Sequence, residues 1–237
     1  MKKRILTVAL VAALLATCFA GTYAYLSDTD EQKNTFTTGN VGISLDEAVV
    51  RKDDTTGNLV ADGSKRTAEN QTYHLFPGMT VTKDPTITVD AVSEDAWVAA
   101  KVTVTGDLHD LIGVPGYDNI DIHKLASGGL ITPNATQVNG WNGLSMVYET
   151  ADCVIYQAAD KASNTWTLYI FMKAVQQKNA KVVLFDTLTV PAAWDNAEMN
   201  KVNNTQIYVQ AFAVQANGFA DCFAAMTTAF ADHFEFN

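Results

Sequence analysis

The sequence is poor in the residues that most often carry chemistry. Its 237 residues include four histidines and three cysteines. No two histidines form a His-Glu-x-x-His motif, which would place two zinc ligands and a general base on one helix face. The Gly-x-Ser-x-Gly, Walker and Gly-x-Gly-x-x-Gly motifs are also absent. We therefore expect a protein that is not an enzyme, with no catalytic, cofactor-binding or metal-binding residues.

Basic residues are also scarce. Lys and Arg number 16 against 26 Asp and Glu, which gives a formal net charge of -10. A chain of this charge repels nucleic acid and anionic membrane surfaces, so neither is an expected partner. Acidic clusters at Asp28–Glu31, Asp53-Asp54 and Asp118–Asp121 offer the oxygen ligands that calcium prefers, but none has the EF-hand spacing. Calcium is the one ion that the sequence leaves open.

Only one long apolar run occurs, and it lies at the N-terminus. Lys2–Arg4 form a positive start, Ile5–Ala16 is almost wholly apolar, and Thr22–Ala24 supplies small residues at the key positions. This pattern predicts a cleavable secretory signal helix over residues 1–24, with cleavage between Ala24 and Tyr25. The apolar core is shorter than the roughly 20 residues that span a bilayer, although an uncleaved anchor is an alternative.

The signal predicts where the protein works. We expect it to touch the membrane only before cleavage and then to be secreted, to the extracellular matrix or the cell surface. No later segment is apolar enough to cross a membrane, and no wall-sorting motif occurs. Cys153 and Cys222 remain after cleavage, and an even pair in an exported chain suggests either a disulfide or two free buried thiols.

The rest of the chain reads mainly as β-strands. Apolar and polar residues alternate over Trp166–Lys173 and Ile207–Val214, and shorter alternating runs precede them. Period-two patterns separated by turns, without alternating helices, predict an antiparallel β-sandwich over residues 39–237, and we expect a jelly-roll arrangement. Apolar residues at three- and four-residue intervals predict one helix at Ala216–Phe234. The polar segment Asp46–Asn70 is expected to be a long loop.

Four segments resemble a known family. They are Gly21–Asp28, Asn34–Val41, Leu75–Gly78 followed by Lys83–Pro85, and Tyr208–Phe219. Together they are similar to the TasA/camelysin (CalY) family, and the first resembles the cleavage region of the dedicated signal peptidase SipW. The resemblance covers both ends and one central turn.

The resemblance implies a structural subunit of extracellular biofilm-matrix fibres with a jelly-roll fold. In such fibres the N-terminal segment of one copy enters the next copy as a donor strand. Here residues 25–38 would be that segment or a linker, with Tyr25, Leu26 and Phe36 as its apolar anchors. The implied partners are a second copy of the chain and a SipW-type signal peptidase. Alternatives are a simple polar tail at this position, a camelysin-type metallopeptidase, and a soluble adhesin or ligand-binding module.

Overall fold

The computed structural model describes residues 40–105, 136–138, 142, 147–160, 165–234 and 236. Residues 39–237 group into one compact unit. The described residues fold into two sheets of six strands each, in the orders β10-β4-β1-β2-β3-β11 and β12-β5-β9-β8-β7-β6. Among these described residues, no helix is long and apolar enough to span a membrane.

The first sheet is built around β1, which pairs with a strand on each side. Its strands are β1 (Ile43–Lys52), β2 (Leu59–Thr67), β3 (Thr80–Thr82), β4 (Thr86–Val89), β10 (Lys181–Val183) and β11 (Thr187–Thr189). β4 pairs with the first half of β1, and β2 pairs with the second half. All pairs are antiparallel except β2 with β3, which touch in parallel through Leu59 and Val81.

The second sheet carries the long strands. They are β5 (Ala96–Thr105), β6 (Thr136–Val138), β7 (Val147–Glu149), β8 (Cys153–Asp160), β9 (Thr165–Met172) and β12 (Ile207–Gln215). Every pair in it is antiparallel. The main core lies between the two sheets, with Ile87, Val102 and Leu168 all fully buried. The predicted antiparallel sandwich is therefore confirmed.

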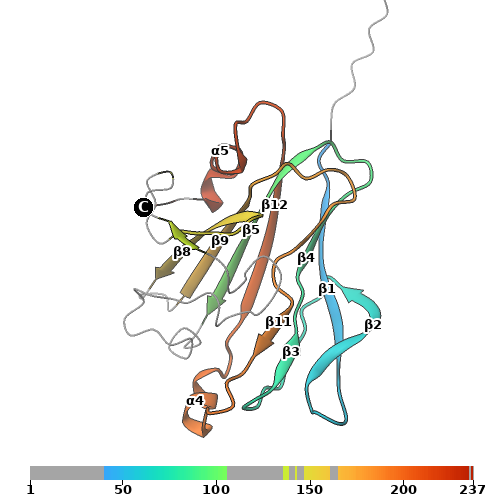
Figure 1. Ribbon diagram of the computed structural model, residues 1–237, viewed down its shortest axis with the longest axis vertical. Helices are drawn as coiled ribbons and strands as arrows, with labels where there is room; N and C mark the ends of the chain where they lie inside the picture. The colour runs from blue at the N-terminus through green and yellow to red at the C-terminus, as the bar shows by residue number, and fades with distance from the viewer. Residues whose placement is uncertain are drawn as a thin grey trace, which may run out of the picture. The chain divides into compact units, whose positions relative to one another are not determined.

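The outer face of the second sheet is covered by the C-terminal residues. Helix α5 (Cys222–Ala229) and the 3-10 turn η1 (Ala231–His233) pack on it, and Figure 1 shows them beside β8, β9 and β5. Rings of Phe212, Phe234 and Phe236 join this second cluster. A second short helix, α4 (Asn196–Lys201), precedes β12 and begins with a capping box between Asp195 and Glu198.

Two predicted elements need correction. The segment expected to be a loop, Asp46–Asn70, instead forms most of the β1–β2 hairpin. Its polar residues bond across strands: Arg66 donates to both Asp46 and Asp84, each at 2.7 Å. The predicted helix begins later than expected, because β12 runs to Gln215 and Asp221 caps α5 by accepting from the Ala224 N–H at 2.8 Å.

The chain makes a tight turn at Phe76–Met79, just before β3. The Met79 N–H donates to the Phe76 carbonyl at 3.1 Å, and Gly78 has φ of 80°. A type II turn needs a positive φ at this third position, which glycine adopts without strain. Pro85 then opens β4, as expected for a residue that forces its predecessor to be extended.

Candidate assembly surface

β12 lies at the edge of its sheet and pairs on one side only, with β5. The Thr105 N–H donates to the Gln206 carbonyl, and the Ala216 N–H donates to that of Asp95. Because bonded and non-bonded pairs alternate in an antiparallel ladder, the even-numbered residues of β12 face β5. The N–H and C=O groups of Val209 and Ala211 therefore point away from the sheet. Among the described residues, no strand pairs with them.

Among the described residues, the start of β1 gives a second free edge, in the opposite sheet, because β2 pairs only with the second half of β1. The Asp90 N–H donates to the Gly42 carbonyl at 2.9 Å, so the even-numbered residues at the start of β1 face β4. The backbone groups of Ile43 and Leu45 point the other way. β1 and β12 approach each other across the sandwich. We call this region the open side; it comprises Ile43, Leu45, Ile207, Val209, Ala211 and Ala213.

The core is less covered along the open side than elsewhere. All six open-side side chains pack against the inter-sheet core, yet each is only partly buried. Their neighbours one strand further in, such as Val98 and Val102 on β5, are 0% exposed. An added strand at this position would cover apolar surface and satisfy unpaired backbone groups at once. The open side can therefore accept an extended segment.

A nearly buried polar cluster lies next to the open side. Lys83 Nζ is 2.5 Å from Glu47 Oε2, with side-chain exposures of 9% and 13%. The other oxygen, Glu47 Oε1, accepts from Tyr73 Oη at 3.1 Å and from Gln71 Nε2 at 3.0 Å. Burial and the Glu47 carboxylate raise the pKa of the Tyr73 hydroxyl, which therefore stays protonated and donates. This Glu47 cluster joins β1 to the segment that leads into β4.

The Glu47 cluster also stabilises an irregularity in β1. The pairing with β2 shifts register between Ala48 and Val50. The amide of Gln71 donates to the Ala48 carbonyl and accepts from the Val50 N–H, while Asp84 accepts from the Ala48 N–H. The pairing of β1 with β4 ends at Asp46. Beyond that residue, the side chains of Gln71 and Asp84 take the place of a paired strand on the β4 side of β1. The last of these side-chain hydrogen bonds is made by the Val50 N–H.

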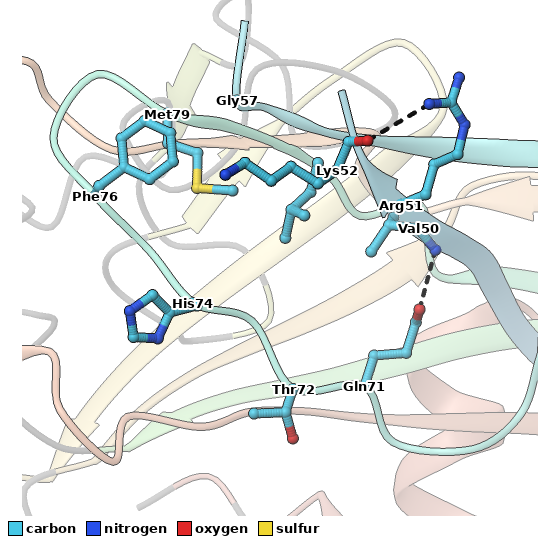
Figure 2. Close-up of a pocket in the computed structure, with 10 residues that line it drawn as sticks. Val50, Arg51, Lys52, Gly57, Gln71, Thr72, His74, Phe76 and Met79 are labelled. Carbon is cyan, nitrogen blue, oxygen red and sulfur yellow. Dashed lines mark hydrogen bonds between the residues drawn. The ribbon is translucent and has the colours of Figure 1, made fainter. Parts of the chain in front are cut away.

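A hollow of about 480 Å³ begins at Val50, where these side-chain hydrogen bonds end. Its walls come from the end of β1, the start of β2 and the segment that leads to the Phe76 turn (Figure 2). We call it the cationic hollow; it is lined by Val50, Arg51, Lys52, Gly57, Leu59, Gln71, Thr72, His74, Phe76 and Met79. Figure 2 shows Lys52 reaching toward Phe76 and Met79, with His74 on the facing wall.

The described residues place few chemical groups together. Among them, no group of three or more His, Cys, Asp or Glu side chains could hold a metal ion. Asp53, considered as a calcium ligand, instead accepts from the N–H groups of Thr55 and Thr56 within its own turn. His109, His123 and the acidic clusters at Asp28–Glu31 and Asp118–Asp121 lie outside the described residues.

Cys153 and Cys222, the two cysteines among the described residues, are free and buried. Of the two alternatives that the sequence left open, the structure has the free thiols rather than a Cys153–Cys222 disulfide. Burial raises the pKa of Cys153 to about 11 and that of Cys222 to about 12. Thiols of this kind are poor nucleophiles at neutral pH because almost none is ionised.

The residues predicted to act in export and assembly lie outside the described residues. They are the cleavage pair Ala24 and Tyr25, together with Leu26 and Phe36. The acceptor surfaces were not predicted from the sequence. The period-two pattern of Ile207–Val214 predicted a strand, but nothing in it marks an edge strand, because strand order depends on distant pairings.

Comparison with known families gives a match at the N-terminal end of the chain. The family model described as camelysin metallo-endopeptidase matches residues 1–57, which include the predicted signal, the predicted donor segment and β1. A comparison with curated proteins gives no match. The N-terminal part of the chain, residues 1–57, is therefore similar to the camelysin family, which agrees with the resemblance seen in the sequence.

Proposed function

We propose that this chain is a secreted, non-enzymatic subunit of extracellular matrix fibres. After cleavage at Ala24 by a SipW-type peptidase, residues 25–38 of one copy add a strand to the next copy. The observation that carries this proposal is the open side. Among the described residues, the outer edge of β12 pairs with no strand, and the apolar side chains along it are only partly buried. Backbone pairing would give affinity, and apolar anchors would give specificity.

The segment is long enough for this role. Residues 25–38, fully extended, span about 45 Å, whereas the nine residues of β12 span about 30 Å. The contact is head-to-tail, because the donor segment and the acceptor edge are different surfaces of one chain. A heterologous contact that does not close into a ring produces an open filament. Signal cleavage would then control assembly, since an uncleaved signal holds the segment at the membrane.

Electron microscopy of two purified chains tests the proposal. The chain that begins at Tyr25 should form filaments, and the chain that begins at Gly39 should stay monomeric with unchanged far-UV circular dichroism. Tyr25→Asp and Phe36→Asp should also weaken assembly, because an unpaired carboxylate would be buried at an apolar anchor. Asn34→Asp adds the same charge at a polar position and is the matched control. Equal polymerisation of both chains would overturn the proposal.

The family description favours a second candidate function, a secreted metallo-endopeptidase. That candidate requires a bound metal and chelator-sensitive cleavage of protein. Metal analysis of the purified chain, combined with a casein-cleavage assay with and without chelator, separates it from the structural role. A chain that neither polymerises nor cleaves would favour an adhesin or ligand-binding module.

A further inference from the structure

We propose that the cationic hollow binds the acidic start of the donor segment, Tyr25–Glu31, from a second copy. This inference rests on the proposed function and identifies a second contact for the same segment, beyond the open side.

The hollow combines a cation with an apolar floor. Leu59, Phe76 and Met79 supply apolar surface, and no carboxylate lines it. Phe76 keeps 37% of its surface exposed, which is unusual for a large apolar side chain in this fold. Two neighbouring carboxylates are already engaged: Asp62 pairs with Lys65 at 2.6 Å, and Asp53 accepts within its turn. Lys52 has no ion pair among the described residues.

The hollow also presents a free strand edge. The Asp53 N–H donates to the Asn58 carbonyl, which marks a bonded pair between the two strands of the hairpin. By alternation, Val50 and Lys52 turn their backbone groups away from β2 and toward the hollow. The Val50 N–H is taken by Gln71, but the Val50 carbonyl and the Lys52 N–H have no partner among the described residues. An extended peptide could pair with both.

The start of the donor segment has the matching chemistry. Tyr25 and Leu26 are apolar, and Asp28, Asp30 and Glu31 are acidic. In an extended chain, side chains two residues apart share a face. Leu26, Asp28 and Asp30 would therefore lie on one face, with an apolar group for the floor and carboxylates for Lys52.

The position of the hollow fits the length of the segment. β12 has nine residues, so a donor that pairs with seven of them through residues 32–38 leaves Tyr25–Glu31 beyond the strand. The Ile207 end of β12 borders Thr67–Asn70, and three of the next four residues, Gln71, Thr72 and His74, line the hollow. A segment that leaves the open side at this end therefore meets the hollow next.

Charge exchange in the chain that begins at Tyr25 tests the inference. Lys52→Glu should raise the critical concentration for filament formation about fivefold, since it replaces an attraction with a repulsion. Asp28→Lys with Asp30→Lys should do the same, and Lys52→Glu combined with Asp30→Lys should restore assembly in part. Lys178→Glu, an equal charge change at an exposed site, is the control and should have no comparable effect.

Cross-linking identifies the occupant. Copies carrying only Lys52→Cys, mixed with copies carrying only Asp30→Cys, should form a disulfide between chains, and the buried native thiols would not compete.

Filaments that form normally with Lys52→Glu would overturn this inference and leave the proposed function intact. A third sample carries Lys52→Cys and Asp30→Cys in the same chain. If a disulfide forms within that chain but not between the singly substituted copies, the hollow binds the chain's own segment and the inference is overturned. If the unmodified chain forms no filaments, the proposed function fails and this inference fails with it.

Discussion

Cys153 and Cys222 lie on opposite faces of one sheet. Cys153 belongs to the core between the two sheets, whereas Cys222 belongs to the cluster beneath α5. Cys153 pairs with Met172 in the β8–β9 ladder, whereas the Cys222 thiol donates to the Val98 carbonyl of β5 at 3.2 Å. The backbone of the sheet separates the two sulfur atoms. A disulfide would require one strand to leave the sheet.

Both thiols should therefore resist labelling in the native protein. Their raised pKa values, about 11 and about 12, keep them protonated at pH 8, and burial excludes the reagent. An Ellman assay on the chain that begins at Tyr25, without reductant, should find almost no reactive thiol before denaturation and two afterwards. Rapid native labelling, or fewer than two thiols in denaturant, would contradict this.

The ion pair between Lys83 and Glu47 should matter more than any surface pair. Lys83→Ala leaves the Glu47 carboxylate nearly buried without its cation and should lower the free energy of unfolding by about 3 kcal/mol. Lys65→Ala removes an equally short but exposed pair with Asp62 and is the matched control. Urea denaturation measures both. Similar midpoints for the two variants would show that the Glu47 cluster is not a stabilising contact.

The sequence predicted the elements whose pattern is local. β9 alternates strictly between the two apolar clusters, with Trp166, Leu168 and Ile170 on one face and Tyr169 and Phe171 on the other. The β1–β2 hairpin was not predicted, because its second strand is polar and its stability comes from distant partners. Arg66 reaches Asp46 and Asp84, which lie 20 and 18 residues away in sequence. No window of local hydrophobicity contains that information.

Helix α5 shows a related limit. The apolar stripe from Phe219 to Phe234 is real, since Phe219, Phe223, Phe230 and Phe234 all join one cluster. The stripe does not define where the helix starts. Gly218 has φ of 95°, which breaks the helical path, and the cap at Asp221 sets the first turn. Core membership was predictable from spacing, but helix boundaries were not.

Asp53 should control the tip of the β1–β2 hairpin. Hydrogen bonds from the Thr56 backbone and hydroxyl hold the pKa of the Asp53 carboxyl below its ordinary value, so the charged form favours the folded turn. This stabilisation is present above about pH 4 and is lost as the pH falls through the lower folded-state pKa. Asp53→Ala should lower the thermal midpoint at pH 7 more than at pH 2.5, and Asp54→Ala, its exposed neighbour, should change little at either pH.

Differential scanning fluorimetry at the two pH values measures the effect of Asp53. An equal loss for Asp53→Ala at both pH values would mean that the charge of the carboxylate adds nothing to the turn. Because the hairpin also forms walls of the cationic hollow, the same variant should weaken any contact made there.

Proline substitutions in β12 should separate assembly from folding. Ala211 directs its N–H away from β5, so Ala211→Pro removes a donor that no strand of the described part of the chain uses, and proline is tolerated at such edge positions. Gln210→Pro is the matched control one residue earlier, where the N–H faces Lys101 on β5 and its loss breaks the sheet.

We expect Ala211→Pro to keep the circular dichroism spectrum and to lose filaments, because a donor strand would need that N–H. We expect Gln210→Pro to lower the thermal midpoint strongly. A folded Ala211→Pro chain that polymerises at the normal critical concentration would show that the donor strand does not pair with β12.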